Sequence, residues 1–138
     1  MKYIAFLILF TSLNAFGGVF AGYSEGFHLM TEDLNNKHPY IGIDTDHYGY
    51  TIYKNSYNVA SHVLYYKAET SKEDGPLAAG FKVGFTTGYN KYLEKGPFLG
   101  NHLMLAFSQY LMLKYDKFNV NLVTITGESI SSGIEYRF

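Results

Sequence analysis

Apolar and polar residues alternate along much of the chain. Residues 118–122 read Phe-Asn-Val-Asn-Leu, and residues 77–86 carry apolar side chains at odd positions with alanine, glycine, lysine or threonine at even ones. Successive side chains of a β-strand lie on opposite faces of the sheet. Both segments therefore predict strands with one apolar face and one face that is small or polar.

Eight segments bounded by turn residues follow one another along the chain. We expect strands at residues 26–31, 39–45, 48–54, 60–70, 77–88, 103–115, 118–125 and 131–138. The connections at 45–47 and 116–117 are short, whereas those at 71–76 and 89–102 are longer, like the turns and outer loops of bacterial barrels. The pattern predicts an all-β fold, an eight-stranded antiparallel up-and-down β-barrel of the outer-membrane type.

The N-terminus has a different pattern. A lysine at the second position precedes a short apolar run, and small residues follow at Ala15 and Ala21. These features are typical of a secretory signal peptide, and the run is shorter than the roughly 20 residues of a spanning helix. We predict a signal peptide at residues 1–21, with cleavage after Ala21 preferred over cleavage after Ala15, and a single barrel domain at 22–138.

Composition restricts the function classes. The formal net charge is −1, so we expect no surface for nucleic acid, and there is no cysteine for disulfides. The 14 tyrosines favour strands and the water–lipid boundary, with a tyrosine-rich soluble β-sandwich as the alternative. Apart from His28, the histidines are scattered at positions 38, 47, 62 and 102 and form no metal motif. We expect neither a metal nor a cofactor.

His28 and Ser56 are candidates for chemistry. His28 lies on the first expected strand, and Asn55 and Ser56 follow the third. In an up-and-down barrel these two strands run in the same direction, so their ends meet one rim about 10 Å apart, across two strand spacings. An imidazole beside a serine hydroxyl can accept its proton during acyl transfer. The sequence indicates either such a pair or a solvated polar rim.

Four stretches carry a resemblance to a known family. They are Phe27-His28, Tyr53-Lys54-Asn55-Ser56-Tyr57-Asn58, the segment Gly-Phe-Lys-Val-Gly-Phe-Thr-Thr-Gly at 80–88, and the closing Tyr136-Arg137-Phe138. In order and spacing, over most of the mature chain, they resemble the PagP family of outer-membrane lipid A palmitoyltransferases. The active loop of that family reads Phe-Lys-Asp-Ser-Phe-Asn, and its fifth strand reads Gly-Phe-Thr-Ala-Gly.

The resemblance implies transfer of an acyl chain from a phospholipid to lipid A. The family's catalytic His, Ser and Asp fall on His28, Ser56 and Asn55. The amide of Asn55 could orient a hydroxyl but could not balance the charge of an imidazolium. An ungapped pairing from Ser56 places Lys67 at the glycine with which the family measures its acyl chain.

Five residues are candidates for the lumen, the space inside the barrel. They are Gly42, Lys67, Gly80, Lys82 and Gly84. Inward glycines leave room for a ligand, or equally for large side chains from opposite strands. Inward lysines favour a lumen that is filled by the protein itself rather than by hydrocarbon.

We therefore expect a monomeric, PagP-like acyltransferase in the Gram-negative outer membrane after Sec-type export, with the periplasm as the alternative location. Its partners would be membrane lipids, namely phospholipid and lipopolysaccharide. Two alternative functions stay open. One is a non-enzymatic structural or interaction barrel, and the other is a small lipid-binding or ligand-binding barrel.

Overall fold

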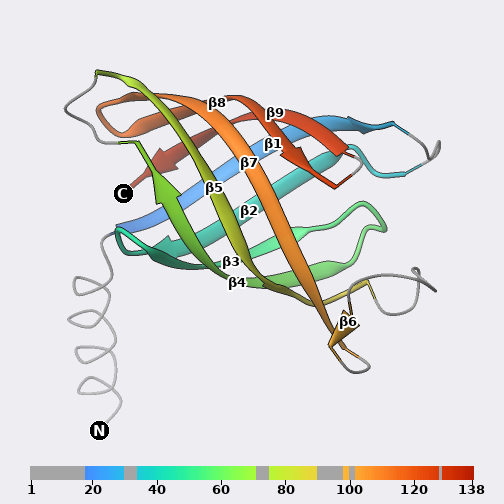
Figure 1. Cartoon of the computed structure of the whole chain (residues 1–138). Helices are drawn as coiled ribbons and strands as arrows, with labels where there is room; N and C mark the ends of the chain where they lie inside the picture. Colours follow the sequence, from blue (N-terminus) through green and yellow to red (C-terminus); the bar gives the residue numbers. More distant parts are fainter. Residues whose placement is uncertain (1–17, 30–33, 71–74, 90–97, 100–101, 128) are drawn as a thin grey trace, which may run out of the picture.

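The computed structural model describes residues 18–29, 34–70, 75–89, 98–99, 102–127 and 129–138. Their strands are β1 (Gly18–His28), β2 (Lys37–Asp44), β3 (Tyr48–Lys54), β4 (Ala60–Glu69), β5 (Leu77–Thr86), β6 (Phe98–Leu99), β7 (Leu103–Tyr115), β8 (Phe118–Thr126) and β9 (Ser129–Arg137). Every neighbouring pair is antiparallel, in the order β5-β4-β3-β2-β1-β9-β8-β7, and pairing of β5 with β7 closes an eight-stranded barrel (Figure 1). Among these residues, no helix is long and apolar enough to cross a membrane.

Most expected strands coincide with observed ones. The boundaries of β2 to β5 and of β7 to β9 agree with the sequence prediction within two residues at each end. The two-residue strand β6 was not expected; it pairs with the start of β7 inside the predicted long connection. The fold class is therefore confirmed, because alternation of period two is a local property that the tertiary structure preserves.

The first strand is longer than expected. The predicted strand at 26–31 is wrong at both ends, since β1 begins at Gly18 and pairs with β2 and β9 along its length. The prediction missed residues 18–25; at 18–22 both faces are apolar or small, which hides the alternation. Phe20 is 2% exposed and points into the lumen. Cleavage after Ala21 would remove part of β1, whereas cleavage after Ala15 would leave it whole; residues 1–17 lie outside the described residues.

The connections divide between the two ends of the barrel (Figure 1). The strand ends that flank the links from β2 to β3, from β4 to β5 and from β7 to β8 lie at one end, which also holds the C-terminus (Figure 1). The expectation that the link after β4 belongs with the link after β5 is wrong, because β4 ends at the same rim as β2 and β7. The links from β1 to β2, β3 to β4 and β5 to β7 lie at the other end, and we call that end the site rim.

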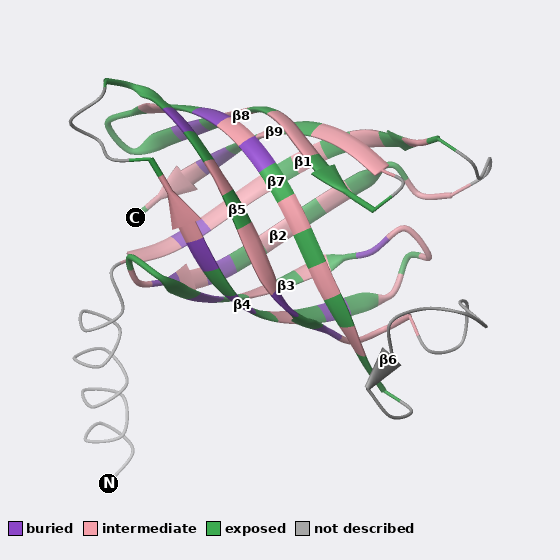
Figure 2. Ribbon diagram, viewed as in Figure 1, coloured by how far each residue is buried: buried purple, intermediate pink, exposed green. Residues whose placement is uncertain are grey.

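The outer face of the barrel is apolar. Exposed and less exposed residues alternate along the strands (Figure 2). The exposed aliphatic side chains include Ile41, Ile52, Leu64, Leu105, Val120, Leu122 and Ile134. Aromatic rings contact one another near the end opposite the site rim, as in the pairs Tyr48–Tyr66 and Phe118–Tyr136, whose ring centroids are 5.6 and 5.1 Å apart. Such a band with an aromatic girdle is typical of barrels in membranes.

Large inward rings lie over glycines of neighbouring strands. A Cβ atom at Gly49 would lie 2.3 Å from the Tyr65 ring, and one at Gly22 would lie equally close to Tyr40. Phe20 occupies the space beside Gly42 in the same way, since a Cβ atom at Gly42 would lie 2.5 Å from the Phe20 ring. These glycines make the narrow lumen wide enough for aromatic side chains.

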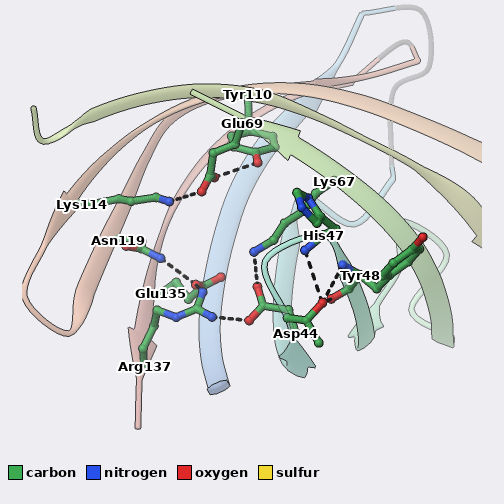
Figure 3. Close-up of polar contacts among 11 residues, drawn as sticks. Asp44, His47, Tyr48, Lys67, Glu69, Tyr110, Lys114, Asn119, Glu135 and Arg137 are labelled. Atoms are coloured by element: carbon green, nitrogen blue, oxygen red, sulfur yellow. Dashed lines mark hydrogen bonds and ion pairs between the residues drawn. The ribbon is translucent and has the colours of Figure 1, made fainter. Parts of the chain in front are cut away.

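A polar network crosses the lumen at the end opposite the site rim (Figure 3). Its members are Asp44, Lys67, Glu69, Tyr110, Lys114, Asn119, Glu135 and Arg137. Asp44 pairs with Lys67 at 2.6 Å and also with Arg137, which reaches Glu135 at 3.0 Å. Glu69 binds Lys114 and accepts a 2.9 Å hydrogen bond from the Tyr110 hydroxyl. This network pairs the lumen charges at that end and links several strands.

Candidate functional site

His28 and Ser56 meet at the site rim. His28 is the last residue of β1, and Ser56 lies in the turn that follows β3. The Nε2 atom of His28 is 2.7 Å from the Ser56 hydroxyl oxygen, which is a hydrogen bond between partly buried side chains. The parallel direction of β1 and β3 brings the two residues to one rim, and inward or rim-facing side chains span the intervening strand. The contact has the geometry that a general base and a nucleophilic hydroxyl require.

A third polar group contacts the other nitrogen of the imidazole. The Oδ1 atom of Asn36 lies 3.2 Å from Nδ1 of His28. Since an amide oxygen only accepts hydrogen bonds, this contact places the proton on Nδ1 and leaves Nε2 free to accept the Ser56 proton. The arrangement of Ser56, His28 and Asn36 resembles the Cys-His-Asn arrangement of papain-like proteases, with serine in place of cysteine.

The segment before β2 holds this arrangement in place. The backbone N–H of Asn35 donates to the Ser56 carbonyl at 2.7 Å, and its side-chain amide donates to the Asn55 carbonyl at 3.1 Å. The carbonyl of Asn36 accepts from the Gly26 N–H at 3.0 Å. The link between β1 and β2 is thus bonded both to the Ser56 turn and to β1, which fixes Asn36 beside His28.

Asn55 shapes the turn instead of contacting the imidazole. Its side chain is fully buried, and its Oδ1 accepts hydrogen bonds from the N–H groups of Tyr57 and Val59 at 2.9 and 3.0 Å. Its Nδ2 donates to the Ser61 hydroxyl and to the Gly88 carbonyl at 2.9 and 3.1 Å. All four side-chain bonds serve the turn and its neighbours, so the expected orienting contact of Asn55 with the His–Ser pair is not formed.

A cavity of about 240 Å³ opens beside Ser56 and extends into the lumen. Tyr53 and Tyr89 line it near the rim, and their hydroxyls are 2.8 Å apart. Burial, with a smaller contribution from the neighbouring Tyr53, raises the pKa of the Tyr89 hydroxyl above its usual value. Tyr89 therefore stays protonated and can act as a hydrogen-bond donor at the cavity mouth.

His38 also lines this cavity. Its Nδ1 lies 2.8 Å from the carbonyl oxygen of Lys54, so Nδ1 carries the proton and donates it to that carbonyl. The sequence placed His38 among the uninformative histidines. Its position on the lumen wall beside Ser56 makes it a second imidazole of the site.

The five lumen candidates have different surroundings. The Phe20 ring occupies the space beside Gly42, and the Tyr110 ring occupies the space beside Gly80. A Cβ atom at Gly84 would lie 2.0 Å from the Leu64 carbonyl oxygen, and Gly84 is the glycine among the five that lines the cavity. Of the two lysines, Lys67 belongs to the polar network, whereas Lys82 lines the cavity.

Asn36 is the site residue that sequence reasoning missed. It lies just before β2 in a segment without alternation, and only the fold brings it beside His28.

In the ranges that the structure describes, no cluster of His, Asp or Glu could hold a metal ion. Comparison with known proteins adds no family: neither the family models nor the curated proteins contain a match to this chain. The fold and site define an eight-stranded barrel with an Asn–His–Ser arrangement at one rim.

Proposed function

We propose that this protein is a PagP-like acyltransferase of the Gram-negative outer membrane, which transfers an acyl chain from a phospholipid to lipid A. The observation that carries the proposal is the 2.7 Å contact between His28 and Ser56 at the mouth of a lumen cavity. A barrel that served only as a scaffold has no physical need for an imidazole so aligned on a serine hydroxyl.

The chemistry follows from the hydrogen bonds. As the Ser56 oxygen attacks an ester carbonyl, His28 Nε2 takes the hydroxyl proton, and the Asn36 amide keeps the ring oriented through Nδ1. The same imidazole then returns the proton to the departing lysophospholipid oxygen. A hydroxyl of lipid A attacks the acyl-serine in turn, with His28 again as the base.

The outer surface supports the location. The exposed aliphatic band and the aromatic contacts near one end suit a hydrocarbon layer and its boundary with water. In that orientation the site rim, which has the longer connections, faces outward, where lipid A is found. The cavity of about 240 Å³ is smaller than the roughly 300–1,000 Å³ of most ligand pockets, which favours a short acyl chain.

The test is mass spectrometry of lipid A and phospholipids from Gram-negative cells expressing the chain or Ser56→Ala. Outer-membrane fractionation and gel mobility of boiled and unboiled samples first establish that each protein is a folded membrane barrel. We expect an added acyl group on lipid A that disappears with Ser56→Ala and persists with Ser132→Ala, an exposed serine of β9. Unchanged lipids in cells with folded protein would contradict the enzymatic proposal.

A non-enzymatic, ligand-binding barrel is the second candidate. Several hydroxyl and amide side chains line the cavity, among them Ser24, Thr51, Ser108, Asn121, Thr124 and Ser131. Hydrocarbon gains little from such a wall, whereas a polar ligand could bond to it. Unchanged lipid A together with saturable binding of a polar solute would favour this function.

A further inference from the structure

Lys82 is the lumen cation that has no ion-pair partner among the described residues. Asp44, Glu69 and Glu135 pair with Lys67, Lys114 and Arg137 in the polar network. Within the described part of the chain, Lys82 makes neither a hydrogen bond nor an ion pair. Its ammonium instead lies over the rings of Tyr65 and Tyr110, 4.8 and 5.4 Å from their centroids. Cation–π contacts recover only part of what an ammonium loses on leaving water.

Lys82 has a second donor beside it. On β7, Ser108 is its direct partner in the antiparallel register, so the two inward side chains are cross-strand neighbours. Both line the cavity, and the Ser108 hydroxyl has no hydrogen-bond partner among the described residues. An ammonium and a hydroxyl that face one cavity without partners form the donor set of an anion site.

The charges around the cavity determine which charge a bound ligand can carry. Glu135 also lines the cavity, but its carboxylate is already bonded to Asn119 at 2.9 Å and to Arg137 at 3.0 Å. With Lys82, four lumen cations stand against three carboxylates, and this excess of one positive charge matches a singly charged anion, while a doubly charged phosphate would meet repulsion from Glu135. A carboxylate has the required charge and two acceptor oxygens for the two donors.

We propose that the lumen cavity binds a small organic acid, whose carboxylate is held by the Lys82 ammonium and the Ser108 hydroxyl. Its two donors are distinct from the His28–Ser56 pair, although Ser56 lines the same cavity, and the inference goes beyond the proposed acyl transfer. The rest of the acid lies in the cavity towards the site rim, between the aromatic wall that includes Tyr53 and the hydroxyl wall that includes Thr124. The chain of the acid can be aliphatic or hydroxylated, and the test distinguishes these two classes of acid.

The test is calorimetric titration of the folded full chain, in polyoxyethylene micelles, with hexanoate and with gluconate. Hexanol and glucose serve as the neutral counterparts. We expect at least one carboxylate to saturate at one per barrel while its neutral counterpart does not. Saturation by hexanoate indicates an aliphatic acid, and saturation by gluconate a hydroxylated one. If neither saturates, the proposal is wrong.

Matched variants assign the site. Lys82→Met should weaken carboxylate binding at least tenfold, and Lys117→Met, which changes an exposed lysine in the turn between β7 and β8, should not. If Lys82→Met does not fold, Ser108→Val provides a second test, and we expect it to weaken carboxylate binding several-fold. Carboxylate binding is measured without any lipid acceptor, so the site can hold even if acyl transfer fails. Equal binding by wild type, Lys82→Met and Ser108→Val would overturn the proposal.

Discussion

At the scale of single residues, Asn36 makes the polar contact with the His28–Ser56 pair that the sequence suggests for Asn55. Asn55 lies beside Ser56 in the chain, yet its amide bonds only to the turn and its neighbours. Asn36 is far from Ser56 in the chain, yet its oxygen contacts the imidazole that bonds to Ser56. Adjacency in sequence therefore identified a residue that shapes the turn, and the fold supplied the one that contacts the imidazole.

Asn36→Ala should slow the proposed acyl transfer on the order of 100-fold, because a base that loses its orienting partner is misplaced for proton transfer. Asn36 is exposed, and its side chain bonds to His28, so the fold should not change. We expect kcat to fall with little change in KM. Asn36→Asp should restore most of the rate, since a carboxylate oxygen can accept the same proton.

Lys37→Ala is the matched control, because Lys37 is the exposed neighbour of Asn36. Its kcat should equal that of the wild type. Equal kcat values for Asn36→Ala and Lys37→Ala, with active protein, would show that Asn36 does not position the base.

Asn55→Asp should destabilise the barrel even though it restores the residue of the resembling family. A carboxylate has no N–H to donate to the Gly88 carbonyl, so two acceptors would face each other in a fully buried place. An unsatisfied buried group costs about 1–3 kcal/mol, and more if it is charged. Urea unfolding of the protein in micelles measures this loss. Asn36→Asp, at an exposed position, should unfold like the wild type.

At the scale of elements, β1 carries the largest disagreement with the sequence prediction. Gly18 to Ala21 continue the strand beyond the expected signal-peptide boundary, and Phe20 fills space beside Gly42. A mature protein that began at Gly22 would lose this ring from the lumen. Removal of a buried phenylalanine side chain costs roughly 3–5 kcal/mol.

We therefore predict that the mature protein begins at Phe16, after cleavage behind Ala15. Intact-mass measurement of protein purified from outer membranes gives the first residue directly. Ala15→Tyr should impair processing, because cleavage needs a small residue there. Ala21→Tyr is the control and should be processed normally. A mass corresponding to a start at Gly22 would contradict the prediction.

At the scale of the whole molecule, the barrel combines an apolar exterior with a lumen that is polar at both ends. The polar network joins β2, β4, β7, β8 and β9 across the lumen (Figure 3). The site rim holds the His–Ser pair and the cavity mouth. The two ends of the interior thus differ in their side chains, since one carries paired charges that link strands and the other carries the His–Ser pair beside the cavity.

Asp44→Asn should destabilise the whole barrel, because Asp44 is the partner of both Lys67 and Arg137. Removing one member of a buried ion pair leaves an uncompensated charge and costs roughly 3–5 kcal/mol. The urea midpoint of the folded protein in micelles measures the effect. Asp46→Asn, in the adjacent turn, changes an exposed carboxylate and should shift the midpoint little. Equal midpoints would show that the network does not stabilise the barrel.

The sequence by itself determined the strands and the fold class. Alternation is local, so β3 and β7 were predicted to the residue, and the strand count followed. The shared direction of β1 and β3 was enough to place His28 and Ser56 at one rim. Where alternation is hidden, as at Val19 to Ala21, the sequence could not show the strand.

Only the tertiary structure decided how side chains meet across strands. The rings that lie over glycines, the pairing of lumen charges and the contact of Asn36 with His28 depend on register and closure, which join distant segments. A period of two specifies which face a residue occupies but not which residue lies opposite. For that reason Lys67 and Lys82 looked alike in the sequence, although closure gives Lys67 an acidic partner and leaves Lys82 facing the cavity.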